Sequence, residues 1–135
     1  MTVTIHSVLL VDDDPAANFL HRLAIKSSGR VEKILDATSG ADALNYLRRA
    51  QTGEIRIPDL LLLDINMPGM SGWQLLDVCA QEAVPLPCVV SMLTTSENPD
   101  DRQRAATHPA VADFLTKFME TTDFERLLDR HHRRT

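Results

Sequence analysis

Acidic side chains follow two short apolar runs of this sequence, at the point where each run ends. Asp12 and Asp13 come directly after Val8–Val11, and Asp64 comes directly after Leu60–Leu63. If the two runs are neighbouring parallel strands, their carboxyl ends meet at one edge of a sheet, where open α/β proteins bind ligands. Ionised carboxylates held that close repel one another unless a cation joins them. The spacing therefore predicts a cation site formed by Asp12, Asp13 and Asp64.

The candidate ligand atoms are all oxygens, which favours a hard divalent cation. Mg²⁺ fits best, with Mn²⁺ as a substitute, because it accepts one or two carboxylates, a carbonyl and several waters. Lys117 follows a further apolar run, Phe114–Leu115, and the only other lysines are Lys26 and Lys33. Three carboxylates, one Mg²⁺ and the Lys117 ammonium carry no net formal charge together, which supports placing Lys117 beside the acids.

The positions of these acids and of Lys117 depend on the strands that precede them in the sequence. Short continuous apolar runs are typical of strands buried on both faces of a parallel sheet, and here they alternate with segments of helical spacing. The predicted strands contain Val8–Val11, Ile34–Ala37, Leu60–Leu63, Cys88–Val90 and Phe114–Leu115. The alternation predicts an α/β fold with a mainly parallel sheet.

The first and fourth predicted helices differ in how much apolar surface they offer. In the first, Asp14 can cap the helix, Pro15 suits its first position and Gly29 ends it. The residues expected to form its apolar face are Phe19, Leu20, Leu23 and Ala24. The fourth helix, at 100–107, offers little beyond Ala105 and Ala106, so we expect it to pack weakly and to be a candidate moving part.

The composition limits the class of protein. A chain of 135 residues with 44% hydrophobic and 24% charged residues is typical of one globular domain. Its net charge of −5 argues against binding nucleic acid through phosphate neutralisation. Cys79 and Cys88 lie in apolar stretches without metal or disulfide spacing, and residues 1–7 lack the features of a signal peptide. We therefore expect a cytoplasmic protein with buried thiols and with no nucleic-acid or membrane partner.

Several segments resemble the receiver domain of two-component response regulators. The resembling segments are Val8–Asp13, Pro58–Gly72, Thr94–Thr95 and Phe114–Lys117. They occur in the family's order and cover nearly the whole chain. The resemblance implies a flavodoxin-like, doubly wound, five-stranded parallel sheet. It also implies a stand-alone receiver domain over 1–135, with its core at about 6–129 and a short polar tail at 130–135.

The resemblance implies roles for the matching acidic residues. Asp64 would accept a phosphoryl group. Asp13 and Asp64 would ligate Mg²⁺ directly, and Asp12 would do so directly or through water. The Asn66 backbone carbonyl would complete the protein's ligands. The chemistry agrees, because an aspartate attacks an anionic phosphoryl group poorly unless a metal neutralises charge on both partners.

Further residues match the family's phosphoryl-binding and switch positions. Lys117 would pair with a phosphoryl oxygen, and the Thr94 hydroxyl would hydrogen-bond the phosphoryl group. Phe114 would swing inward with Thr94. The output surface would then be the fourth helix, the fifth strand and the fifth helix, through which a homodimer could also form.

The function implied is a phosphorylation switch. A phosphohistidine on a sensor histidine kinase or a histidine phosphotransfer protein would donate its phosphoryl group to Asp64, and the output would be binding to another protein. We expect no enzymatic activity beyond self-phosphorylation from a phosphodonor and autodephosphorylation. Two alternatives remain open. Asp12-x-Asp14 has the spacing of an aspartate-nucleophile phosphatase, and a receiver could dock without phosphorylation.

The chain departs from the family pattern at two positions. The family commonly follows its lysine with a proline in a cis peptide, whereas Phe118 follows Lys117 here. A non-proline cis bond costs about 2.5–4 kcal/mol, so the sequence leaves both isomers open. Asp14 is an additional acid after the first run. We assign it to helix capping because Asp12 and Asp13 come first beyond the apolar residues.

Overall fold

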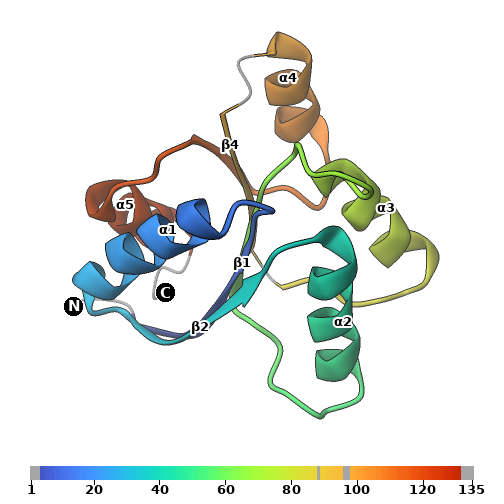
Figure 1. Cartoon of the computed structure of the whole chain (residues 1–135), viewed down its shortest axis with the longest axis horizontal. Coiled ribbons are helices and arrows are strands. Elements are labelled where there is room, and N and C mark those ends of the chain that lie inside the picture. The colour runs from blue at the N-terminus through green and yellow to red at the C-terminus, as the bar shows by residue number, and fades with distance from the viewer. Residues whose placement is uncertain (1–3, 88, 96–97, 132–135) are drawn as a thin grey trace.

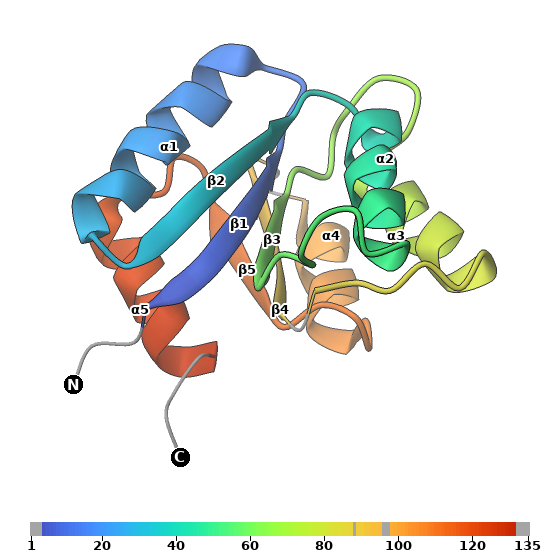
Figure 2. The same cartoon turned by 90° about the horizontal axis from the view of Figure 1, so that it is seen from below.

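The computed structural model describes residues 4–87, 89–95 and 98–131. They form a sheet of five parallel strands in the order β2-β1-β3-β4-β5, with helices on both faces (Figure 1 and Figure 2). The strands are β1 (Ile5–Val11), β2 (Val31–Ala37), β3 (Leu60–Leu63), β4 (Val89–Thr94) and β5 (Asp113–Thr116). This strand order confirms the predicted flavodoxin-like, doubly wound sheet.

The helices divide between the two faces of the sheet. Helices α1 and α5 cover one face, and α2, α3 and α4 cover the other (Figure 1). The helices are α1 (Pro15–Ser28), α2 (Gly40–Gln51), α3 (Gly72–Gln81), α4 (Pro99–Thr107) and α5 (Thr121–His131). The chain runs outward from β1 to β2 and then returns past β1 to β3. Right-handed crossovers in opposite directions therefore place α1 and α2 on opposite faces.

The two central strands are buried on both sides. In β1, Val8 and Leu10 belong to the apolar layer beneath α1 and α5, whereas Leu9 and Val11 belong to the layer beneath α2 and α3. All of Leu60–Leu63 in β3 is buried. The residues that follow these strands are therefore held in place by the tightly packed centre of the sheet.

Strand β2 begins three residues before the predicted run at Ile34. Its first residues include the exposed Glu32 and Lys33, which are typical of a sheet edge and hide the apolar pattern. Strand β4 extends the predicted run through Thr94, and every described residue of it is buried. The predicted strand residue Cys88 lies outside the described part of the chain.

The predicted apolar face of α1 is wrong, because its large members point to solvent. Phe19, Leu20 and Leu23 are 59%, 49% and 46% exposed. The residues of α1 that are buried instead are Ala17, Asn18, His21 and Ile25. Two of these are polar, and both have backbone partners elsewhere in the fold, so hydropathy alone favoured the wrong side of the helix. The helix boundaries agree with the prediction, since Asp14 caps its start and Gly29 ends it at a φ of 66°.

Helix α4 is attached more by polar and aromatic contacts than by apolar burial. Ala105 is its one buried residue, and Ala106 is exposed. Trp73 of α3 supplies the contacts: its indole N–H donates to Asp101 Oδ1 at 3.2 Å, and the Arg104 guanidinium lies 4.6 Å from its ring centroid. The prediction of weak apolar packing for this helix agrees with its burial.

Helix α5 packs through Phe124, Leu127 and Leu128, as its spacing predicts. It continues into the predicted polar tail, where Arg130 and His131 are helical and contact Asp113 of β5. Residues 132–135 lie outside the described part of the chain.

The one described cysteine, Cys79, is buried, as the sequence predicts, and it is unpaired. Across 4–87, 89–95 and 98–131, every helix is too short or too polar to cross a membrane.

Candidate functional site

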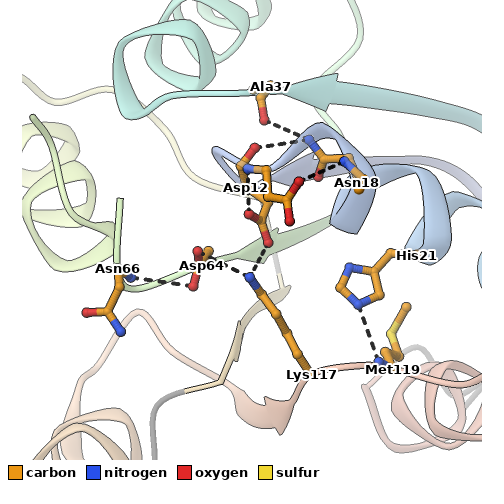
Figure 3. Close-up of polar contacts among 10 residues, drawn as sticks. Asp12, Asn18, His21, Ala37, Asp64, Asn66, Lys117 and Met119 are labelled. Carbon is orange, nitrogen blue, oxygen red and sulfur yellow. Dashed lines mark hydrogen bonds and ion pairs between the residues drawn. The ribbon is translucent and has the colours of Figure 1, made fainter. Parts of the chain in front are cut away.

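The carboxyl ends of β1 and β3 bring Asp12 and Asp64 together (Figure 3). Val11 and Leu63 are register partners, so Asp12 and Asp64 are the next residues on adjacent strands. Asp12 and Asp64 are 3% and 4% exposed, whereas Asp13 is exposed. One carboxylate oxygen from each of Asp12, Asp13 and Asp64 lies within 4.8 Å of the others. The structure thus assembles the acidic cluster that the sequence predicts.

Lys117 enters this cluster from the end of β5. Its Nζ forms an ion pair with Asp12 Oδ2 and lies 3.3 Å from Asp64 Oδ2 (Figure 3). Its backbone N–H donates to the Thr94 carbonyl at 3.0 Å, which ties the end of β5 to the end of β4. The ammonium therefore lies between the two buried carboxylates.

Burial and charge oppose each other at Asp64. Burial raises the pKa of its carboxyl, and the Asp12 charge raises it further, whereas the Lys117 charge and hydrogen bonds from Lys117 and the Thr94 hydroxyl lower it. The net direction is upward. For Lys117, burial alone would lower the pKa, but the hydrogen bond to Asp12 and the charges of Asp64 and Asp12 outweigh burial and raise it. Lys117 is therefore protonated at neutral pH, and its ammonium lies beside an Asp64 carboxyl whose ionisation is disfavoured by burial.

The backbone around Asp12 is held by a residue that the sequence reasoning missed. Asn18 Nδ2 donates to the Asp12 carbonyl at 3.1 Å and to the Ala37 carbonyl at 3.2 Å, joining α1 to the ends of β1 and β2. Asp14 N–H donates to Asp12 Oδ1 at 2.9 Å, and Asp14 Oδ1 accepts from Ala16 N–H at 3.0 Å. Asp14 therefore caps α1, as expected. Both carbonyls that Asn18 contacts lie outside α1, so the spacing within α1 gives no signal for this role.

A tight turn supports Asp64 from the other side. Gly72 N–H donates to the Ile65 carbonyl at 2.9 Å, and a Cβ at Gly72 would lie 2.4 Å from the Asp64 carbonyl oxygen. Only glycine allows α3 to approach the backbone of Asp64 this closely. Asn66 N–H contacts Asp64 Oδ1 at 3.4 Å, and the Asn66 side chain is exposed. Its backbone carbonyl as a metal ligand stays a prediction.

The donor set fits a hard divalent cation. The carboxylates of Asp12, Asp13 and Asp64 supply only oxygen ligands, and their mutual repulsion favours a cation between them. Lys117 compensates part of this charge at present, since its Nζ contacts two of the three acids. Asp13 is exposed to solvent, in contrast to the buried Asp12 and Asp64.

The two predicted switch residues lie on adjacent strands. Thr94 is fully buried at the end of β4, and its hydroxyl hydrogen-bonds Asp64. Phe114 of β5 is half-buried, with the Arg102 guanidinium of α4 4.8 Å from its ring centroid. Their roles as a switch stay predictions. The Lys117–Phe118 peptide is cis, which decides the isomer that the sequence left open.

Comparison with known proteins supports the same family. The family model for the response regulator receiver domain matches residues 8–129. The chain is 29% identical over 122 residues to two-component response regulator ORR1 of Oryza sativa subsp. japonica, covering 89% of this chain and 52% of that protein. It is 30% identical over 122 residues to the probable methanogenesis regulatory protein FilR2 of Methanothrix harundinacea, covering 90% of this chain and 78% of that protein.

A solved structure extends the comparison to the whole fold. The two-component response regulator from Cytophaga hutchinsonii has a TM-score of 0.87 and 34% identity, covering 96% of this chain and 98% of that one. The present chain spans about half the length of the rice proteins it matches. The match of the family model to most of the chain, together with this fold, decides the assignment: the chain belongs to the receiver domain family of two-component response regulators.

Proposed function

We propose that this receiver accepts a phosphoryl group on Asp64, with Mg²⁺, from a phosphohistidine of a sensor histidine kinase or a histidine phosphotransfer protein. The observation that carries the proposal is the cluster of Asp12, Asp13 and Asp64 with the Lys117 ammonium beside it. A neutral or purely acidic strand edge would lack either the nucleophile or the counter-charge that phosphoryl transfer needs.

Asp64 is the nucleophile in this proposal. One of its carboxylate oxygens attacks phosphorus, the P–N bond of the phosphohistidine breaks, and the bonding pair leaves with the imidazole. Asp12, Asp13, Asp64 and the Asn66 carbonyl would hold Mg²⁺, which would neutralise charge on the phosphoryl oxygens. Because burial raises the Asp64 pKa, the Lys117 charge is needed to favour the ionised nucleophile.

Lys117 and Thr94 then bind the transferred group. Both already hydrogen-bond the Asp64 carboxylate, so short movements of the Lys117 Nζ and the Thr94 hydroxyl would bring them to phosphoryl oxygens. Movement of the Thr94 hydroxyl from Asp64 toward the phosphoryl group would open space for Phe114 on the adjacent strand β5. The phosphoryl group would thereby change the surface formed by α4, β5 and α5.

The output in this proposal is binding to a further protein, or to a second copy of this chain, through the surface of α4, β5 and α5. Two observations support it. Helix α4 buries only Ala105, so moving it disrupts little apolar contact. A groove between α4 and β5 is lined by Arg102, Ala106 and Phe114, so it would change shape if Phe114 moved.

Further parts of the proposal concern activity and location. The chain would catalyse only its own phosphorylation and dephosphorylation. It would act in the cytoplasm, and the buried free thiol of Cys79 is compatible with a reducing compartment.

The phosphatase alternative is less well supported by the side-chain contacts. Its second acid would be Asp14, whose carboxylate instead accepts the N–H of Ala16 as the cap of α1. Its nucleophile would be Asp12, which is paired with Lys117 as Asp64 is, so the capping role of Asp14 is the contact that separates the two functions.

Incubation with acetyl phosphate and Mg²⁺ tests the proposal and separates it from the phosphatase. We expect a single acid-stable, base-labile phosphoryl group, measured by intact mass, in the parent and in the matched control Asp14→Ala. We expect none in Asp64→Ala. Labelling of Asp64→Ala with loss of label in Asp14→Ala would overturn the assignment. If a kinase phosphorylates the chain but binding to its downstream target is the same with and without the phosphoryl group, a receiver that docks independently of phosphorylation would be the better description.

A further inference from the structure

His21 is a buried titratable residue that the proposed reaction does not use. It lies on the inner face of α1 and is 1% exposed. Its Nε2 accepts a hydrogen bond from the Met119 backbone N–H at 3.3 Å, across the gap between α1 and the segment that joins β5 to α5 (Figure 3). Met119 follows Lys117 by two residues. His21 therefore contacts the backbone that carries the lysine of the site.

The hydrogen bond requires a neutral imidazole. Nε2 must offer a lone pair to the Met119 N–H, which assigns the ring proton to Nδ1. The surroundings favour this form, because burial lowers the pKa of His21, the Lys117 charge lowers it further, and only the Asp12 charge opposes them. A protonated ring would place an N–H against the Met119 N–H and lose the acceptor.

Two more contacts hold this segment and the start of α5 against α1. The Phe118 ring lies against the imidazole, with ring centroids 5.6 Å apart. The Thr121 hydroxyl donates to the Ala24 carbonyl at 2.9 Å. Of the two hydrogen bonds, the one to His21 is nearer to Lys117 in the chain, and it is buried.

Lys117 needs such support because its side chain must stay between two carboxylates. Its backbone is tied to β4 on one side by the hydrogen bond to the Thr94 carbonyl. On the other side strand pairing has ended, since β5 stops at Thr116. The Met119–His21 hydrogen bond supplies a second anchor just beyond Lys117, while the Met119 side chain is buried in the apolar layer beneath α1 and α5.

We propose that His21 is a positioning residue for the phosphoryl-transfer site: its neutral Nε2 anchors the segment after β5 and thereby sets the position of the Lys117 ammonium against the phosphoryl group. This inference rests on the proposed function, since it assigns Lys117 to a phosphoryl oxygen. His21 itself touches neither the acids nor the phosphoryl group.

The test uses variants that separate the hydrogen bond from packing. His21→Leu removes the acceptor and keeps a side chain of similar size. His21→Gln retains an acceptor near the position of Nε2. Thr121→Val is the matched control, because it removes a hydrogen bond to α1 from the start of α5, just beyond this segment. His21→Phe is a second apolar variant that retains an aromatic ring against Phe118, should His21→Leu fail to fold.

The measured quantities are the dissociation constant for beryllofluoride, a phosphoryl mimic, at saturating Mg²⁺ and the rate of phosphorylation by acetyl phosphate. We expect His21→Leu or His21→Phe to weaken beryllofluoride binding about tenfold, which corresponds to about 1.4 kcal/mol. His21→Gln should return it to within about twofold of the parent, and Thr121→Val should have a smaller effect than His21→Leu. Mg²⁺ affinity should change less than beryllofluoride affinity, because the proposed Mg²⁺ ligands directly follow β1 and β3 and none lies in the segment that His21 anchors.

A double-mutant cycle identifies the route of the effect. In a Lys117→Ala background, His21→Leu should cause no further loss of beryllofluoride affinity, because the group it positions is already absent. The Met119 amide resonance should shift in His21→Leu and return toward the parent in His21→Gln.

The outcomes distinguish this inference from the proposed function. If the parent binds neither beryllofluoride nor a phosphoryl group, both fail. If the parent binds beryllofluoride and folded His21→Leu or His21→Phe binds it equally well, only the positioning role is wrong. Equal losses in His21→Gln and His21→Leu, or additive losses with Lys117→Ala, would also refute it.

Discussion

Replacing Asp64 by asparagine should stabilise the metal-free protein, even though it removes the proposed nucleophile. Asp64 faces the carboxylates of Asp12 and Asp13 within a cluster of oxygens no more than 4.8 Å apart. At an effective dielectric constant of about 20, two charges 4.8 Å apart repel by about 3.5 kcal/mol. Asp13 is exposed, so solvent reduces its share to about 1 kcal/mol at most.

Attraction to Lys117 opposes this repulsion. At 3.3 Å the same dielectric constant gives about 5 kcal/mol for the Asp64–Lys117 pair, so the charge interactions nearly cancel. The cost of burying the Asp64 carboxylate then decides the sign, and burial is the largest contribution that raises its pKa. In Asp64→Asn, Lys117 keeps its ion pair with Asp12. We expect a net gain of about 1–2 kcal/mol in the free energy of unfolding.

Thermal melts in EDTA and in Mg²⁺ provide the assay. The gain corresponds to a rise in Tm of about 4–8 °C without metal. Saturating Mg²⁺ should reverse the order, because an ion at about 100 times its Kd stabilises the parent by about 2.7 kcal/mol and binds the variant less tightly. Asp77→Asn is the matched control, since Asp77 is exposed on α3, away from the cluster, and should behave as the parent in both conditions.

The pH dependence has a definite sign. Because the Asp64 pKa is raised in the folded protein, the unfolded chain releases its proton first as pH rises above about 3.8, and the parent loses stability from there until Asp64 ionises in the folded state. The advantage of Asp64→Asn should therefore be present at neutral pH and vanish below about pH 3.8. A variant that melts below the parent in EDTA at neutral pH would refute the reasoning and make the Lys117 pair dominant.

Other substitutions test the supports and surfaces of the site. Gly72→Ala should destabilise the protein by about 1–3 kcal/mol and slow acetyl phosphate labelling, because its Cβ would meet the Asp64 carbonyl oxygen at 2.4 Å; unchanged melts and labelling rates would contradict this. Trp73→Phe removes the hydrogen bond to Asp101 but keeps an aromatic ring. The free energy of local opening of α4 should fall by about 1 kcal/mol, so its amide hydrogen exchange should become severalfold faster, while exchange in α1 serves as the internal control. Leu20 lies on the exposed apolar side of α1, so Leu20→Ser should weaken phosphotransfer from a donor protein that contacts this side and leave labelling by acetyl phosphate unchanged. Equal effects on both donors would exclude a contact between Leu20 and the donor protein.

The strand ends and the acidic cluster could be predicted from local patterns. Four consecutive buried leucines at 60–63 indicate a central strand, and the next residue must then lie at the sheet edge. The same argument applies to Asp12 after β1 and to Lys117 after β5. Parallel strands share one carboxyl edge, so the approximate convergence of these residues follows from the fold class alone.

The inner face of α1 could not be predicted in the same way. Hydropathy favoured Phe19, Leu20 and Leu23, but the fold buries Asn18 and His21 because the ends of β1 and β2 and the segment after β5 offer them backbone partners. A polar side chain is tolerated inside when its hydrogen bonds are satisfied. The hydropathy pattern of α1 cannot reveal these partners, because they lie outside the helix.

What the sequence by itself determined is therefore the order of the elements, the chemistry at their ends and the family. Only the tertiary structure decided which face of α1 is buried, that Trp73 holds α4, that the Lys117–Phe118 peptide is cis, and that His21 reaches Met119. The physical reason is the separation along the chain between the residues that interact. Strand and helix signals arise among neighbouring residues, whereas the His21–Met119 contact joins residues 98 positions apart and exists only after the sheet brings α1 and α5 to the same face.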